Sequence, residues 1–212
     1  NRLLAKQTRL RLPAELIRDS MLMSSGLLYP EVGGPSIKPP QPEGVSALTY
    51  ASSGGWEETT GPARYKRGLY VHYQRTSPHP QLVNFDSPDT NVACVRRNRS
   101  NTPLQALNLL NDPVFMEGAQ ALAMRVLAEG GNAWDGRIEH AYKLCYGREP
   151  AEPEKERLRA YFARQKSILD REPQSVALLA PNPVEGMERI DVAAWVGLSR
   201  VLMNTDEFIT RE

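Results

Sequence analysis

A dense polar stretch occupies the middle of the chain, between Thr76 and Pro113. Three arginines, Arg96, Arg97 and Arg99, directly precede a segment that is rich in side-chain amides. A guanidinium group can form two parallel hydrogen bonds with a carboxylate, sulfate or phosphate, and neighbouring amides can add further bonds. The stretch is therefore predicted to bind an anionic group. The predicted ligand-binding residues are Arg75, Arg96, Arg97, Arg99, Asn101, Gln105 and Asn108.

A structural role for the same side chains is the competing interpretation. Arginines and amides often satisfy the backbone carbonyls of irregular segments and helix ends, and buried polar groups are almost always paired. The irregular segment 29–63 contains many carbonyls that need such donors. The sequence alone leaves both interpretations open.

His79 and Asp86 are the candidate catalytic residues. His79 lies between two prolines that hold its backbone rigidly, and Asp86 follows in the same loop. An imidazole held in this way could act as a general base, and a nearby carboxylate could orient it. The pair predicts, as the alternative function, part of a hydrolytic or redox-linked enzyme. A turn residue whose ring simply packs is also consistent with the pattern around His79.

The residue patterns of common metal, haem and nucleotide sites are absent from the sequence. It contains no CxxC, CxxCH, HExxH, GxxxxGK[ST], GxGxxG or GxSxG motif. The three histidines, His72, His79 and His140, would have to converge from distant elements to bind a metal ion. We therefore predict neither a metal site nor a cofactor in this chain.

Helices are predicted to hold the polar stretch from its C-terminal side. Asn101 or Thr102 can cap a helix that begins at Pro103, and Asp112 can cap a second helix that begins at Pro113. The apolar face of the first helix is predicted to consist of Leu104, Leu107 and Leu110, or of Ala106 and Leu109. Apolar residues at helical spacing predict further helices over residues 114–129, 138–145, 153–172 and 191–204.

The N-terminal half is predicted to be less regular. A helix should begin at Pro13 and end near Gly26, and segment 29–63 should be mostly irregular because glycine and proline dominate it. Alternating residues 69–73 predict a strand, with residues 81–85 or 92–95 as its weak partners. The predicted fold is mainly α, with five to six helices and at most a short two-stranded β element. We expect one domain over 1–212, divided into an N-terminal helix (1–28), an irregular and short-strand region (29–100) and a helical core (101–212).

Two aromatic side chains and the two cysteines allow two interpretations each. Trp56 and Tyr50 could stack on a sugar or base, but the simpler interpretation is that they cover apolar surface. Cys94 could form a disulfide with Cys145 in an oxidising compartment, but free buried thiols are favoured.

Composition restricts the class of protein. The chain has 212 residues, 41% of them hydrophobic, and a net charge of +1, so a broad basic nucleic-acid-binding face is not expected. Residues 64–99 nevertheless contain seven basic and two acidic side chains, which favours a local anionic partner. No run of 18 apolar residues is present, so no membrane segment is predicted. Because the chain begins at Asn1 rather than at methionine, we expect it to be a piece of a longer protein.

Three segments of the sequence carry a family resemblance: RGLYVHYQRTSPHPQLVNFDSPD, RRNRSNTPLQALNLLNDP and the closing VLMNTDEFITRE. In these segments the chain resembles the C-terminal module of large planctomycete proteins. This module is known as domain of unknown function 1553. The resemblance implies an extracytoplasmic, periplasmic or cell-surface setting, behind upstream domains of the same polypeptide that often include a cytochrome-c-like one. Haem would belong to such an upstream domain. The family supplies no established activity, so the expected function is an accessory module that binds an anionic glycan.

Overall fold

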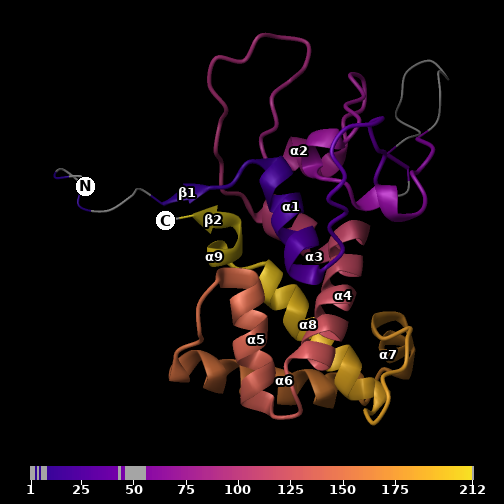
Figure 1. The fold of residues 1–212 in the computed structure, drawn as a ribbon, viewed down its shortest axis with the longest axis vertical. Helices are drawn as coiled ribbons and strands as arrows, with labels where there is room; N and C mark the ends of the chain where they lie inside the picture. The colour runs from indigo at the N-terminus through magenta and orange to yellow at the C-terminus, as the bar shows by residue number, and fades with distance from the viewer. Residues whose placement is uncertain (1–2, 4, 6–8, 43, 46–55, 212) are drawn as a thin grey trace.

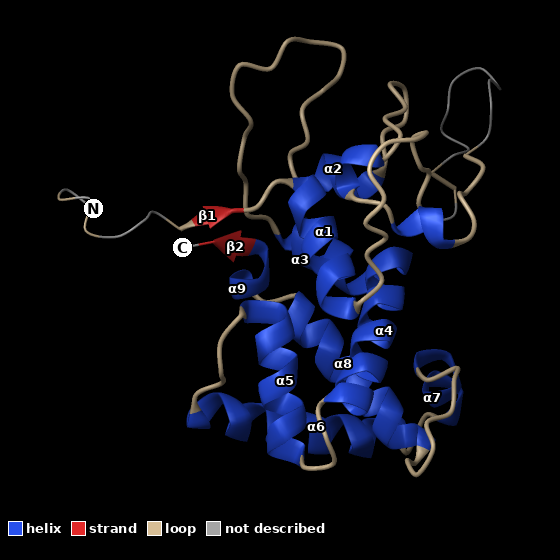
Figure 2. Cartoon of the chain, viewed as in Figure 1, coloured by secondary structure: helices blue, strands red, loops and turns tan. Residues whose placement is uncertain are grey.

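The computed structural model describes residues 3, 5, 9–42, 44, 45 and 56–211. These residues are mainly helical, as predicted (Figures 1 and 2). The nine α-helices among them are α1 (Ala14–Ser25), α2 (Pro80–Asn84), α3 (Pro103–Asn111), α4 (Pro113–Glu129), α5 (Trp134–Tyr146), α6 (Glu152–Leu169), α7 (Pro173–Leu179), α8 (Arg189–Met203) and α9 (Asp206–Ile209). The number exceeds the prediction because α2, α7 and α9 are short and carry weak periodic patterns.

The β element lies elsewhere than predicted. Strand β1 (Leu10–Arg11) pairs in antiparallel fashion with β2 (Thr210–Arg211) and joins the two ends of the described chain. The predicted strand over 69–73 is wrong: residues 68–70 form a short 3-10 helix, and Val71 makes only an isolated bridge to Ile37. Its proposed partners are helix α2 and an exposed loop. Alternation over five residues was too short to separate a strand from a packed loop.

Helix α1 follows the prediction at both ends. It begins directly after Pro13 and ends at Gly26, which has a φ of 77°. The Gly26 N–H donates to Met23 O at 3.2 Å and closes the last turn. Ile17 and Met21 are completely buried. Segment 29–63 is irregular wherever it is described, apart from the start of a 3-10 helix at Pro62–Tyr65. Tyr50 lies outside the described residues.

Helices α3 and α4 meet at the predicted corner. The Asp112 carboxylate caps α4 by accepting the Val114 N–H at 2.9 Å, and the backbone N–H of Thr102 donates to Gln105 Oε1 at 3.4 Å at the start of α3. The predicted apolar face of α3 is wrong for two leucines, because Leu104 and Leu107 remain 55% and 54% exposed. The buried face carries Gln105 and Leu109, and Asp112 at the following corner is also buried.

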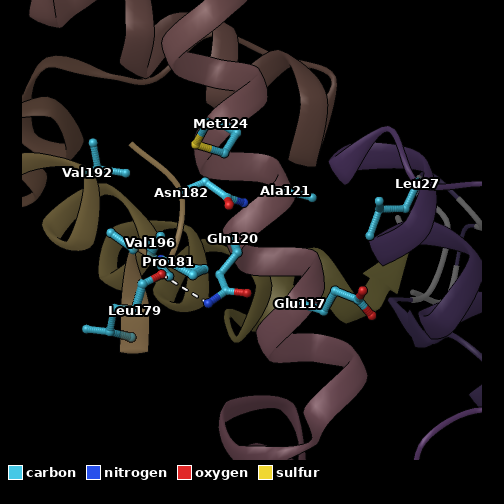
Figure 3. A pocket seen from close by; sticks show the side chains of 11 residues that line it. Leu27, Glu117, Gln120, Ala121, Met124, Leu179, Pro181, Asn182, Val192 and Val196 are labelled. Atoms are coloured by element: carbon cyan, nitrogen blue, oxygen red, sulfur yellow. Dashed lines mark hydrogen bonds between the residues drawn. The ribbon is translucent and has the colours of Figure 1, made fainter. Parts of the chain in front are cut away.

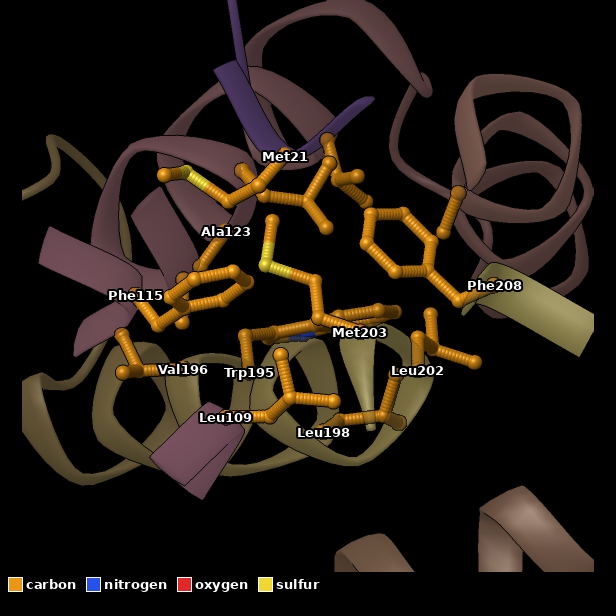
Figure 4. Close-up of a cluster of buried hydrophobic side chains, with 14 of the residues drawn as sticks. Met21, Leu109, Phe115, Ala123, Trp195, Val196, Leu198, Leu202, Met203 and Phe208 are labelled. Atoms are coloured by element: carbon orange, nitrogen blue, oxygen red, sulfur yellow. The ribbon is translucent and has the colours of Figure 1, made fainter. Parts of the chain in front are cut away.

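The hydrophobic core lies between α4 and α8, with α1 and α9 packed over it (Figure 4). Trp195 of α8 is buried against two rings of the neighbouring helices, Trp134 of α5 at 5.0 Å and Phe162 of α6 at 5.5 Å between ring centroids. Helices α1 and α4 come so close that a side chain at Gly118 would overlap Met21. The predicted central position of the last long helix is confirmed by its ten buried residues. Among the helices described, none combines the length and apolarity required to cross a bilayer.

Candidate functional site

The three central arginines lie on one exposed loop, residues 87–99, which connects α2 to α3. This loop rises above α1 and α2 in Figure 1, and residues 89–99 are all exposed. Arg97 donates to the Glu15 carboxylate of α1 at 2.9 Å. Arg96 and Arg99 form no hydrogen bond or ion pair with the described residues, and with Arg97 and Asn98 they line a shallow hollow. Two guanidinium groups are thus available to a ligand.

Asp86 fixes the base of this loop. Its φ of +58° lies in the left-handed region, which aspartate tolerates better than most residues. The carboxylate accepts three hydrogen bonds: from the Arg11 guanidinium at 2.5 Å, from the Ser100 N–H at 2.7 Å and from the Ser100 hydroxyl at 2.8 Å. Burial alone would raise the pKa of Asp86, but the Ser100 hydrogen bonds and the Arg11 charge outweigh it, so the pKa is lowered. Asp86 therefore acts as a clamp, which holds the two ends of the loop to each other and to β1.

We expect Asp86→Asn to make the loop more mobile while its backbone conformation is kept. Asparagine tolerates the left-handed backbone but removes the charge that binds Arg11 and Ser100, so a loss of about 1–3 kcal/mol is expected. Trypsin should then cleave faster after Arg96, Arg97 and Arg99. Asp89→Asn is the matched control because Asp89 lies exposed in the same loop and accepts only from Asn91 in the described part of the chain. Equal cleavage of the two variants would disprove the clamp.

Two of the three predicted amides, Gln105 and Asn108, lie on the inner side of α3 rather than beside the arginines. Gln105 is 1% exposed, and its Nε2 donates to Asn84 O at 2.9 Å and to Ser100 Oγ at 3.0 Å. Asn108 is half-buried and donates to Asp112 at 3.3 Å. Asn101 and Arg75 are exposed. The expected single centre of arginines and amides is not formed, because Gln105 has the structural role while Arg96 and Arg99 remain outside.

His79 and Asp86 belong to different clusters. His79 is 1% exposed, its Nε2 lies 3.0 Å from Pro40 O, and its ring packs 5.8 Å from that of Trp56. No hydrogen bond between His79 and Asp86 occurs in the described structure, and Asp86 is occupied by Arg11 and Ser100. The geometry matches a packed turn histidine. Trp56 itself is half-buried and donates to Pro39 O at 2.7 Å, which agrees with the covering role.

The charges of two further buried groups, Asp112 and Arg18, affect the pKa of His79. Burial lowers the pKa of His79, while its hydrogen bond to Pro40 and the Asp112 charge act in the opposite direction. Burial likewise raises the pKa of Asp112 and lowers that of Arg18 to about 10. Arg18, 1% exposed, donates to Arg64 O at 2.8 Å, which links α1 to the irregular region. We call these three buried side chains the internal polar centre: their charges act on one another, and each forms a hydrogen bond with the backbone.

Arg18 was missed by the sequence reasoning, although a signal was present. It directly follows Ile17 and precedes Met21 by three residues, which places it beside the apolar face of a helix. A long charged side chain there must find partners inside the protein. Arg11 was also missed because its partner Asp86 is distant in sequence, and the sequence carries no signal for that pairing.

Neither cysteine forms a disulfide. Cys94 is exposed in the arginine loop, whereas Cys145 of α5 is partly buried, and burial raises its pKa to about 12. The favoured interpretation of free thiols is correct, but burial of Cys94 is not. Within the residues that the structure describes, no group of three or more His, Cys, Asp or Glu side chains is arranged to hold a metal ion.

The fold and site together define a mainly helical module with an internal polar centre and a clamped, arginine-bearing loop. The chain belongs to the PSD1 family, described as protein of unknown function (DUF1553), whose family model matches residues 1–162. The match ends inside α6, so the core helix α8 lies beyond it. Comparison with curated proteins found no match, and comparison with solved structures found none either.

Proposed function

We propose that this chain is an accessory binding module that holds an anionic, polysaccharide-type ligand on its arginine loop, residues 87–99. The observation that carries the proposal is the pair of exposed guanidinium groups, Arg96 and Arg99, which have no ionic partner among the described residues. Sulfate and carboxylate groups on a polymer are suitable partners because each can accept two hydrogen bonds from one guanidinium.

The clamp at Asp86 supports this proposal. Ordering a flexible loop on binding costs conformational entropy and weakens the affinity for the ligand. This cost is smaller for a loop whose ends are already fixed. Ser100, bonded to both Asp86 and Gln105, connects the loop directly to the start of α3. Within the loop, three arginines accompany only one acidic residue, Asp89, so the local charge favours anions.

Three further expectations remain proposals that rest on the family resemblance. The module is proposed to act outside the cytoplasm and to follow upstream domains of the same polypeptide, in which any haem would lie. The alternative function, a hydrolytic or redox-linked enzyme using His79 and Asp86, gains no support from the geometry, because each side chain is occupied by separate partners.

The double variant Arg96→Gln/Arg99→Gln tests the proposal. Its binding to dextran sulfate and polygalacturonate, measured by calorimetry at about physiological ionic strength, should be weaker by a factor of about 10 or more, because two charge-assisted contacts are lost. Uncharged dextran should bind neither protein. The variant should unfold at the wild-type temperature because both side chains are exposed and unpaired.

A matched control separates a site from general charge attraction. Arg164→Gln/Arg171→Gln removes two exposed guanidinium groups from α6 and the turn after it. This control should bind both polyanions as the wild type does. If the two double variants lose affinity equally, or if neither loses any, the arginine loop is not the binding site.

A further inference from the structure

A second candidate site shares no residue with the arginine loop and lies between α4, α8 and the segment that follows α7. It is a pocket of about 230 Å³ (Figure 3). Ala121 and Met124 of α4 form one wall, and Val192 and Val196 of α8 form another. Leu27, after α1, closes one side. The pocket is larger than the apolar cavity of about 150 Å³ that is known to admit a benzene ring in another protein.

Hydrogen bonds hold the roof of this pocket in place. The roof is the segment from Leu179 to Asn182, and α7, which leads into it, has no buried residue. Gln120 Nε2 donates to the carbonyls of Leu178 and Leu179 at 3.1 and 3.0 Å. From the other side, Arg189 Nε donates to Ala180 O at 2.7 Å. The roof is thus fixed from two sides, while the small Ala121 side chain leaves the space below it unfilled.

The polar groups around the pocket indicate what it can accept. Because both partners of Gln120 Nε2 are carbonyl oxygens, its amide orientation is fixed, and Gln120 Oε1 remains as an acceptor without a partner in the described structure. Asn182 at the mouth likewise has no hydrogen-bond partner among the described residues. Glu117, the one charged lining residue, already accepts Arg64 at 2.8 Å and Tyr65 at 2.6 Å. A charged ligand would therefore find no free counter-charge here.

We propose that this pocket binds a small neutral aromatic molecule that carries one N–H or O–H donor. The ring lies between Ala121, Val192 and Val196 and contacts the Met124 thioether, a sulfur that packs favourably against aromatic rings. The donor bonds to Gln120 Oε1 or to Asn182. The site is independent of the arginine loop and requires none of its residues.

Indole and phenol are the probes that test the site, with benzoate as the anionic comparison. Titration into the whole chain, followed by ¹H–¹³C spectra of methyl-labelled valine and methionine, should show saturable shifts of Val192, Val196 and Met124. Benzoate should cause no saturable shift. Absence of saturation by both indole and phenol would overturn the proposal.

Filling the pocket provides the matched variant. Ala121→Leu adds a branched side chain inside the pocket and should weaken indole binding by a factor of about 10 or more, while a cavity-filling change leaves the fold intact or more stable. Ala163→Leu, at an exposed position of α6, should bind indole as the wild type does. If Ala121→Leu folds, as judged by its thermal unfolding, and binds indole unchanged, the site is not this pocket.

Benzothiophene, which has the shape of indole without its N–H, tests the donor. Indole should bind about fivefold more tightly, the effect of one hydrogen bond. Equal affinities would overturn the assignment of Gln120 and Asn182 as acceptors.

Discussion

Asp112→Ala is expected to lower the free energy of unfolding by about 3–5 kcal/mol, the usual result of removing one partner from a buried charged cluster. The Asp112 carboxylate caps α4 through the Val114 N–H and accepts a hydrogen bond from Asn108. Its negative charge also opposes the lowering of the pKa of the buried Arg18. Its loss leaves the start of a 17-residue helix uncapped and removes one of the negative charges that act on Arg18. Chemical unfolding followed by circular dichroism measures the effect.

Asp112→Asn separates the two contributions. Asparagine caps helices about as well as aspartate, so this variant keeps the cap and loses only the charge. It should fall between the wild type and Asp112→Ala. A cost below about 1 kcal/mol for the alanine variant would show that the polar centre around Arg18 does not support the fold in the way described.

Trp195→Ala is the second large effect, with an expected loss of about 3–5 kcal/mol, typical for deleting a buried tryptophan. The ring joins α8 to α5 and α6 through Trp134 and Phe162, so its removal opens a cavity where three helices meet. Thermal unfolding should show the loss directly.

Trp56→Ala is the comparison for Trp195→Ala, because Trp56 is only half-buried in the irregular region. It should cost less than half as much. Equal costs for the two variants would mean that the irregular region contributes as much to stability as the helical core. At temperatures where Trp195→Ala remains folded, its binding of polyanions should be unchanged, since Trp195 is buried against α5 and α6 and is not part of the arginine loop.

Local signals explain which elements could be predicted from the sequence. Pro13 and Gly26 mark the ends of α1, and Pro103 and Pro113 mark the starts of α3 and α4. Proline fixes φ near the helical value, and glycine permits the positive φ that ends the helix. Short helices such as α2 lack a full repeat of apolar residues, so nothing local distinguishes them from turns. The β1–β2 pairing joins the two ends of the described chain, and no nearby turn residue announces it.

The candidate site was predicted only in part, for a physical reason. That arginines would gather near the start of α3 follows from their positions in the sequence, but the side of α3 that turns inward is set by tertiary packing. Leu104 and Leu107 fit the helical period but are exposed. Gln105 is buried instead, and its side chain forms hydrogen bonds with Asn84 and Ser100. Hydrogen-bond partners across the fold therefore outweighed local hydrophobicity, and the sequence contains no measure of that choice.

The pairing of β1 with β2 also determines how the molecule responds to force. Leu10 faces Arg211 and Arg11 faces Thr210, so tension applied through the two ends of the chain would separate these pairs one after another, as a zipper opens. Peeling of this kind requires far less force than sliding strands past each other. The helical body would bear no load until the β1–β2 pairs had separated.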